Sequence, residues 1–215
     1  MIASGQVTVN GVPAKAGQQI SPDVDQVAVN GSPVQLPKTR TYVMLNKPAG
    51  VLTSVGDPRG RPTVTDLMAG DVRVFPVGRL DLDSRGLVLL TDDGELAMRL
   101  MHPSFGVEKE YHVLIAGRPS ESALARLRAG MTIRGEGFQP ATVRITQQSD
   151  QTTEVAMVLR EGRKREVRRM WRALGHRVLD LQRVRIDGLR LGTLREGAMR
   201  PLTPEEIAAL KAAVS

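Results

Sequence analysis

From residue 42 onward the chain is dominated by short segments with the length and residue pattern of β-strands, and this limits the folds open to it. Apolar residues alternate or run without interruption in YVMLNKP (42–48), GLVLLT (86–91), EYHVLI (110–115), TEVAMVLR (153–160) and RVLDLQRVRI (177–186). Parallel strands need a crossover, usually a helix, between each pair, and helix signals are too few for that. The pattern predicts an α+β fold with a central mixed, mostly antiparallel sheet and a few flanking helices.

The helix signals that do exist are specific. Asp93 can cap a helix that carries Leu96 and Leu100, and a second helix is expected to begin after Ser120 and to stop at Gly130. Near the C-terminus Thr203, Pro204 and Glu206 form a capping box with proline at the first helical position.

The first 37 residues contain a short internal echo. VTVNGVPA (7–14) and VAVNGSPV (27–34) each run from an alternating strand into Asn-Gly, the strongest local hairpin signal. LPKTR (36–40) contains proline and two cations and is typical of a linker. Two domains are therefore predicted, a small β-rich domain at 1–37 and a main domain at 41–215.

Composition narrows the classes of partner and site. The chain has 30 lysines and arginines against 23 acids, a net charge of +7, which favours polyanionic partners. It has no cysteine and three scattered histidines, His102, His112 and His176, so no metal site is expected. No segment approaches the length of a membrane span and no nucleotide-binding glycine motif is present, so a cytoplasmic protein without a cofactor is expected.

A strongly basic helix is predicted within RKREVRRMWRALG (163–175). One face carries apolar side chains at helical spacing, namely Val167, Met170, Trp171 and Leu174. The opposite face carries four arginines, Arg165, Arg168, Arg169 and Arg172. Guanidinium groups bind phosphates and carboxylates with two parallel hydrogen bonds, which favours an anion-binding surface. The alternative is an ordinary solvated face.

The loop GRLDLDSRG (78–86) holds more charge than a turn between two buried strands requires. Neighbouring cations favour the ionised form of a carboxylate, which can then serve as a nucleophile or a base. For Asp83 the favoured interpretation is a turn residue that caps local backbone amides. For Asp81 the spacing alone does not separate a structural role from a catalytic one.

These motifs resemble those of the pseudouridine synthases that modify bacterial ribosomal RNA, the RsuA/RluB/RluE/RluF family. The resemblance rests on GRLDLDSRGLVLLTDDGELAMRLMHPS (78–104) followed by KEYHV, on MLNKPAGVLTS (44–54), on EGRKREVRRMW (161–171) and on the closing run RVRIDGLRLGTLREGAMRPLT (183–203). The EVRRMW helix and the MHPS and KEY segments are most similar to the RluB type, which acts on large-subunit RNA. The resemblance implies the pseudouridine synthase fold and isomerisation of a uridine in 23S rather than 16S RNA, without cofactor or metal.

The resemblance also implies roles for individual residues. Asp81 matches the catalytic aspartate, Tyr111 the tyrosine that stacks on the flipped-out base, and Arg168 the basic partner of the aspartate. Arg79 matches an arginine near the space that the base vacates, and Lys47 belongs to a motif that shapes the site and is grouped with the RNA-binding residues. Together with the basic face at Arg165, Arg169 and Arg172, these residues form the predicted site.

Other interpretations stay open at this stage. Tyr111 could be an ordinary core tyrosine, and the chain could be a non-catalytic RNA-binding factor in ribosome assembly that kept the fold. A glycoside hydrolase that uses Asp81 and Asp83 would need carboxyl groups about 5–9 Å apart, and the surrounding arginines argue against it.

The hairpins at 7–34 resemble the second half of an S4-type RNA-binding module whose helical half is missing, so a truncated module is expected. The protein is expected to act as a monomer.

Overall fold

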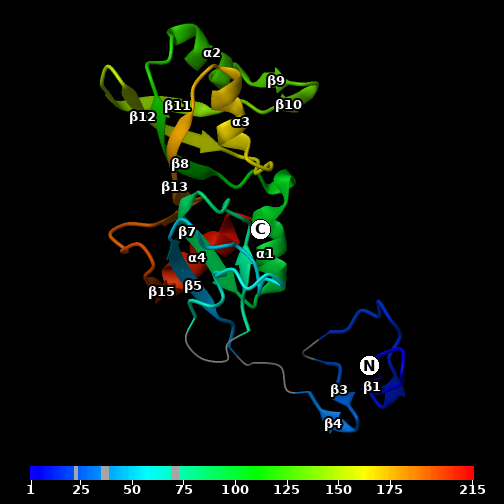
Figure 1. The fold of residues 1–215 in the computed structure, drawn as a ribbon. Helices are drawn as coiled ribbons and strands as arrows, with labels where there is room; N and C mark the ends of the chain where they lie inside the picture. The colour runs from blue at the N-terminus through cyan, green and yellow to red at the C-terminus, as the bar shows by residue number, and fades with distance from the viewer. Residues whose placement is uncertain (22–23, 35–38, 69–72) are drawn as a thin grey trace. The chain divides into compact units, whose positions relative to one another are not determined.

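The computed structural model describes residues 1–21, 24–34, 39–68 and 73–215, and it divides into two compact units. Figure 1 colours the two units, Met1–Arg40 and Thr41–Ser215, along the chain. The boundary lies at the end of the segment 36–40, for which the sequence predicts a linker. Residues 36–38 of that segment fall outside the described residues. No helix in the described part of the chain is long and apolar enough to cross a membrane.

The N-terminal unit contains a four-stranded sheet built from two hairpins. Its strands, in the order β2-β1-β3-β4, are β1 (Val7–Val9), β2 (Val12–Pro13), β3 (Val27–Val29) and β4 (Ser32–Pro33). The Asn-Gly pairs at 10–11 and 30–31 have positive φ at both residues, as a type I′ hairpin turn requires. The two hairpins predicted from the Asn-Gly signals are confirmed.

The second unit is organised around a nine-stranded sheet with the order β11-β12-β8-β13-β7-β5-β15, to which β14 is added beside β13 and β6 beside β7. The strands are β5 (Tyr42–Lys47), β6 (Phe75–Val77), β7 (Arg85–Thr91), β8 (Lys109–Ala116), β11 (Thr142–Gln148), β12 (Thr152–Leu159), β13 (Val178–Ile186), β14 (Leu189–Arg190) and β15 (Met199–Pro201). All of the pairings are antiparallel except β7 with β13. The predicted mixed, mostly antiparallel sheet is confirmed.

Four α-helices and one 3₁₀ turn complete this unit within the described residues. They are α1 (Gly94–Met101), the 3₁₀ turn Pro103–Phe105, α2 (Glu121–Ala129), α3 (Glu166–Ala173) and α4 (Pro204–Ala212). The side chains of Asp93, Ser120 and Thr203 accept hydrogen bonds from the backbone of the first turns that they cap, as predicted. A separate two-stranded hairpin, β9 (Met131–Ile133) and β10 (Glu136–Phe138), follows α2.

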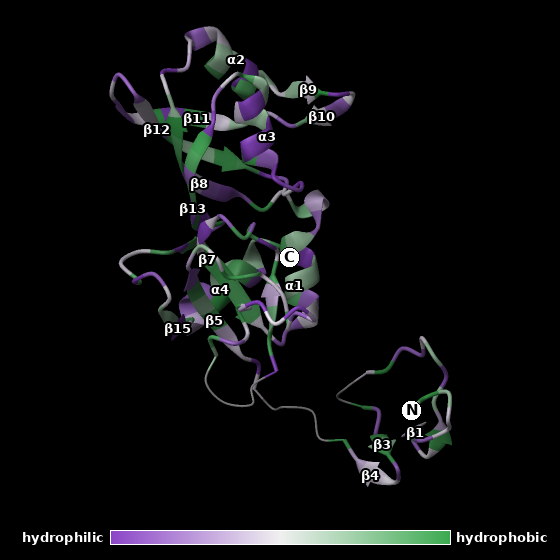
Figure 2. Ribbon diagram, viewed as in Figure 1, coloured by the Kyte–Doolittle hydropathy of each residue, from purple (hydrophilic) through white to green (hydrophobic). Residues whose placement is uncertain are grey.

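Two hydrophobic cores lie on opposite faces of the central strands. Val88 and Leu90 of β7 belong to one core, which includes residues of α2 and α3, and Leu87 and Leu89 belong to the other, which includes residues of α1 and α4. Because successive side chains in a strand point to opposite faces, β7 is buried on both sides and has no polar face. In Figure 2 the central strands are coloured mainly as hydrophobic, whereas helix α3 carries many hydrophilic residues.

The parallel contact between β7 and β13 is short and very close. It pairs Gln182 with Arg85 and Arg183 with Gly86, immediately after the loop that carries Asp81. A Cβ atom built on Gly86, which has φ +108°, would lie 2.2 Å from the carbonyl oxygen of Arg183. Only glycine allows the two strands to approach this closely. This contact joins the two halves of the sheet next to the candidate site.

The capping box of α4 allows a first test of the fold. Thr203 Oγ1 accepts from the N–H of Glu206, and the Glu206 carboxylate accepts from the N–H of Thr203. Thr203→Ala removes one of these bonds and is expected to lower the free energy of unfolding by about 1 kcal/mol. Urea denaturation measures the change. Thr203→Ser keeps the hydroxyl and should stay near the wild type, and an equal loss in both variants would contradict the capping role.

Candidate active site

Asp81 lies in the loop between β6 and β7, and a neighbouring loop holds the backbone on both sides of it. The hydroxyl of Thr53 donates to the carbonyl of Leu80 (2.9 Å) and accepts from the N–H of the same residue (3.2 Å). The N–H of Gly50 donates to the carbonyl of Leu82 (2.8 Å). The position of Asp81 is therefore fixed by the residues before and after it.

Among the residues that the structure describes, Arg165 is the cation at ion-pair distance from Asp81, with Nη1 3.6 Å from Asp81 Oδ2. Arg165 also donates from both Nη atoms to the carboxylate of Asp83, at 3.1 Å each. Arg168 donates instead to the backbone carbonyl of Asp83 (2.8 Å) and lies 3.4 Å from its Oδ2. The predicted direct pairing of Arg168 with Asp81 is not seen, and Arg168 supports the turn that follows Asp81.

Asp83 lies in this turn, as expected, but its carboxylate is an ion-pair partner rather than a simple cap. Burial opposes its ionisation, while hydrogen bonds from Arg165 and the charge of Arg168 outweigh that effect and hold the pKa of Asp83 below its usual value. The carboxylate therefore ties the loop to the start of α3.

Arg165 reaches the loop because it stands just before α3 rather than within it. Its backbone is left-handed (φ 52°, ψ 35°), and the first helical residue is Glu166. Val167, Met170 and Trp171 on the apolar face are buried, as the spacing predicted. The helix is thus shorter at its N-terminus than the basic pattern suggested, and its first arginine turns toward the carboxylates.

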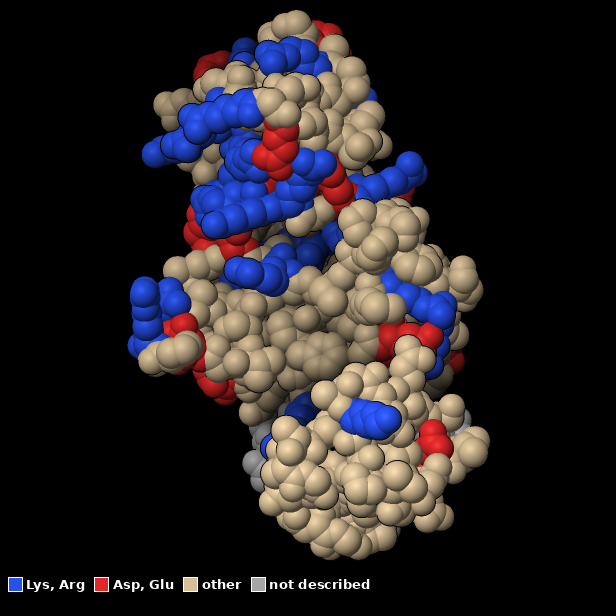
Figure 3. All heavy atoms as spheres, turned by 90° about the vertical axis from the view of Figure 1, so that its right-hand side faces the viewer, with Lys and Arg blue, Asp and Glu red and all other residues tan. Residues whose placement is uncertain are grey.

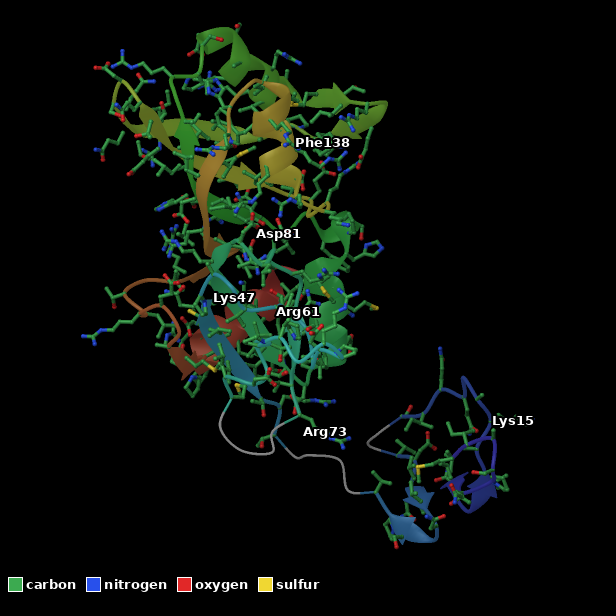
Figure 4. The ribbon with its side chains drawn as sticks, in the orientation of Figure 1. Lys15, Lys47, Arg61, Arg73, Asp81 and Phe138 are labelled. Atoms are coloured by element: carbon green, nitrogen blue, oxygen red, sulfur yellow. The ribbon has the colours of Figure 1, made fainter. Side chains whose placement is uncertain are left out.

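Asp81 and Tyr111 line one pocket of about 290 Å³. Its walls are the loop around Asp81, Tyr111 from β8 and the segment 162–167 that leads into α3, with Leu159 and Leu181 completing it. The volume is near the lower end of the range for small-molecule sites, as a pocket for a single base requires. Figure 4 shows Asp81 where the two halves of the sheet meet.

Tyr111 is both a core residue and a wall of this pocket. Only 8% of its surface is exposed, and it lies opposite Met157 of β12 and Arg183 of β13. Burial raises the pKa of the phenol, although the nearby Arg183 acts in the opposite direction. The ring is therefore neutral and held rigidly by the sheet, as a surface for stacking requires. The two interpretations of Tyr111 left open by the sequence are compatible.

Sequence reasoning missed three charged residues around Tyr111: Lys109, Glu166 and Arg183. Arg183 is 2% exposed, and its Nε donates to the carbonyl of Leu87 at 2.8 Å. Burial lowers the pKa of Lys109, and the charge of Arg183 lowers it further. The signal for Arg183 was its spacing of two from Leu181, which places an arginine on an inward-facing strand position.

Glu166 is a buried acid in the pocket wall, and its titration can be measured. It is 4% exposed; burial, with Glu161 beside it, raises its pKa from 4.5 to about 8. The folded state therefore holds this proton more tightly than the unfolded state, and the resulting stabilisation is complete below pH 4.5 and lost as pH rises through 8. Glu166→Gln should not show this loss, so its melting temperature relative to wild type should rise between pH 5 and 9.

The control for this experiment is Glu154→Gln, which changes an exposed glutamate of β12. Its melting temperature should follow that of the wild type at every pH. If the curves of Glu166→Gln and wild type run parallel over the same range, the raised pKa of Glu166 is contradicted.

Lys47 has a different role from the RNA contact expected for it. It is completely buried at the end of β5, and its Nζ donates to the carbonyls of Val51 (2.7 Å) and Pro48 (2.8 Å). Burial lowers its pKa to about 8, while the carboxylates of Asp83 and Asp81 favour its charged form. Lys47 therefore orders the loop 48–51 that supports Asp81 and does not reach a surface where RNA could contact it.

The remaining predicted cations differ in how they are held. Arg169 forms an ion pair with Glu136 and lies 4.7 Å above the ring of Phe138. Arg79 and Arg172 are exposed, and no carboxylate lies within ion-pair distance of either in the described part of the chain. Figure 3 shows lysine and arginine side chains gathered across one face of the second unit. Among the residues that the structure describes, no group of three or more histidines or acids could hold a metal ion.

Comparison with known proteins identifies the family. The family described as RNA pseudouridylate synthase matches residues 41–173. Two similar proteins are an uncharacterized RNA pseudouridine synthase of Aquifex aeolicus (40% identity over all of this chain and 87% of the relative) and the ribosomal large subunit pseudouridine synthase B of Bacillus subtilis (38% identity, 99% and 88%). A crystal structure of a pseudouridylate synthase aligns with a TM-score of 0.75 and 33% identity over 97% of this chain and 90% of that one. The chain therefore has the pseudouridine synthase fold, and it belongs to the RNA pseudouridine synthases, which are isomerases.

Proposed function

We propose that this enzyme converts one uridine of ribosomal RNA to pseudouridine, with Asp81 as the nucleophile. The observation that supports this role is that Asp81 and Tyr111 line the same pocket, with Arg165 3.6 Å from the carboxylate. A carboxylate that attacks a sugar or a base is the device by which covalent catalysis divides a difficult glycosidic step into two easier ones.

The overall reaction is balanced without a cofactor. The bond between N1 of uracil and C1′ of the ribose breaks, the base turns, and a bond forms between C5 and C1′. The hydrogen on C5 is lost as a proton, and N1 gains one, so no electrons are gained or lost. The enzyme needs to hold the base while it turns, and the rigid ring of Tyr111 offers a stacking surface for this step.

The target nucleotide must leave its stack to enter a pocket of this size, which costs a few kcal/mol. Arg79 lies at the pocket and is exposed. We assign to it the contact with the RNA around the vacated position. Arg168 then acts as a positioning residue, because it holds the backbone of the turn that follows Asp81.

The large ribosomal subunit is the proposed substrate, with the protein acting as a monomer. The support is the Bacillus subtilis relative, which is named for the large subunit and is 38% identical over nearly the whole chain. The N-terminal unit, with its two β-hairpins, is proposed to be part of an S4-like RNA-binding module. A non-catalytic assembly factor is not favoured, because Asp81 is present and the chain belongs to a family of enzymes.

The test of this function is a map of pseudouridines in ribosomal RNA from cells with and without the protein. One 23S position should lose its pseudouridine in the absence of the protein and regain it when the purified enzyme is added to the RNA. Loss of a 16S position would contradict the large-subunit assignment. Unchanged maps, with RNA binding retained, would support the assembly factor.

A further inference from the structure

A basic groove begins beside the catalytic pocket and runs along α3 to the start of β13. It encloses about 390 Å³, and its far end is formed by Arg172, His176 and Arg177. Arg165 lines both this groove and the pocket that contains Asp81, so the two adjoin at this side chain. A strand of RNA whose target nucleotide enters the pocket can therefore follow the groove.

The arginines of the near end of the groove already have carboxylate partners. Arg165 and Arg168 are paired with Asp83, and Arg169 is paired with Glu136 of β10. An external phosphate would have to compete with each of these contacts. The charges of these paired arginines stabilise the loop around Asp83 and the β9–β10 hairpin. The paired arginines therefore contribute little to the binding of an external anion in the groove.

The far end differs in this respect. Arg172 and Arg177 are exposed, and within the described ranges neither has a carboxylate at ion-pair distance. Two guanidinium groups without an internal partner can bind a phosphate without breaking an existing ion pair. Guanidinium matches the geometry of phosphate oxygens with two parallel hydrogen bonds.

His176 lines the same end of the groove, in an orientation that the fold determines. Its Nδ1 lies 2.9 Å from the carbonyl of Ala116, and its ring contacts the edge of Trp171 with the ring centroids 5.9 Å apart. A carbonyl can only accept, so Nδ1 carries a hydrogen, and Nε2 donates to a phosphate oxygen when the ring carries its second hydrogen as imidazolium. No partner of Nε2 is found among the described residues.

We propose that Arg172, His176 and Arg177 form a phosphate-binding site for the RNA strand on one side of the target nucleotide, and that Arg169 does not. This inference rests on the proposed function, because the groove is assigned to RNA on the ground that the adjoining pocket binds the target nucleotide. An RNA strand is favoured over an acidic protein segment because the groove adjoins, at Arg165, a pocket sized for one base. The two arginines of this site have no carboxylate partner among the described residues, so they can contact RNA without breaking an ion pair.

The experiment measures how RNA affinity depends on salt. Binding of a labelled single-stranded ribosomal RNA fragment is followed by fluorescence anisotropy over a range of KCl concentrations, with wild type and the double variant Arg172→Gln/Arg177→Gln. Each lost phosphate contact on a single strand lowers the slope of log affinity against log salt by about 0.7, so a decrease of about 1.4 is expected. The matched control is Arg126→Gln, which removes an exposed arginine of α2 outside both cavities.

Three further results separate the explanations. Arg169→Gln should keep the wild-type slope and lower the melting temperature, since its charge is engaged by Glu136. A double-variant slope equal to that of Arg126→Gln overturns the proposal, and so does competition by poly-glutamate as effective as competition by RNA. Conversion of uridine by the wild-type enzyme is assayed separately, so that failure of the proposed function is recognised whatever the slopes are.

Discussion

Asp81→Asn is expected to reduce pseudouridine formation by on the order of 10⁴-fold or more, as removal of a catalytic nucleophile does. The amide has nearly the same shape as the carboxylate but is not nucleophilic. The ion pair that it removes spans 3.6 Å between side chains that are 27% and 44% exposed, and such pairs contribute little to stability. Folding and RNA affinity should therefore stay near the wild type. Mass spectrometry of treated ribosomal RNA fragments measures the product.

Asp83→Asn is the matched control, because it removes a carboxylate of the same loop, two residues away. Its ion pairs with Arg165 and Arg168 should weaken, so the turn loses support and the product forms more slowly. Product should nevertheless accumulate with time. If Asp81→Asn forms pseudouridine at the wild-type rate, or if only Asp83→Asn is inactive, the assignment of the nucleophile is wrong.

The elements of the fold could be predicted because their signals are local. The Asn-Gly pairs, the caps at Asp93 and Ser120 and the capping box at Thr203 each depend on residues only a few positions apart. The run 86–91 also has a local signal, an uninterrupted apolar sequence that reflects burial on both faces. The parallel pairing between β7 and β13 joins residues about 97 positions apart, and no local pattern reports it.

The ionic partners in the site could not be predicted for the same reason. Helical spacing placed the four arginines of 165–172 on one face, but it could not show that Arg169 meets Glu136 or that Arg165 meets Asp83. Those pairs depend on a hairpin and a loop that approach α3 from elsewhere in the chain. The left-handed backbone at Arg165 also has no signal in the sequence, since arginine seldom adopts it.

Lys47 shows how burial changes the role of a charged residue. The motif around Lys47 favours an RNA contact, yet the ammonium group is buried and donates to two carbonyls of the loop 48–51. Arg183 is the opposite case: it has the spacing of an inward-facing strand residue, which alone assigns no function, and the structure places it beside Tyr111. In both cases the role of the residue depends on how far its long side chain is exposed to solvent, and that exposure is set by the tertiary fold.

Gly86→Ala is expected to destabilise the protein by about 3 kcal/mol or more. The added Cβ would lie 2.2 Å from the carbonyl oxygen and 2.7 Å from the nitrogen of Arg183, and these are backbone atoms that cannot turn away. Forcing a residue with a side chain into φ +108° adds a conformational cost of about 1–3 kcal/mol, and overpacking adds a similar amount. Urea denaturation of the whole chain measures the loss.

The matched control for this change is Gly192→Ala, which separates backbone strain from the steric clash. Gly192 also has positive φ (+60°), but a Cβ there would meet nothing within 4 Å, so this variant should lose only the conformational part, about 1 kcal/mol. Since Arg183 lies beside Tyr111, separation of β7 from β13 in Gly86→Ala should also lower the activity of the molecules that remain folded. Equal losses of stability in the two variants would show that the close contact of β7 and β13 does not contribute as we infer.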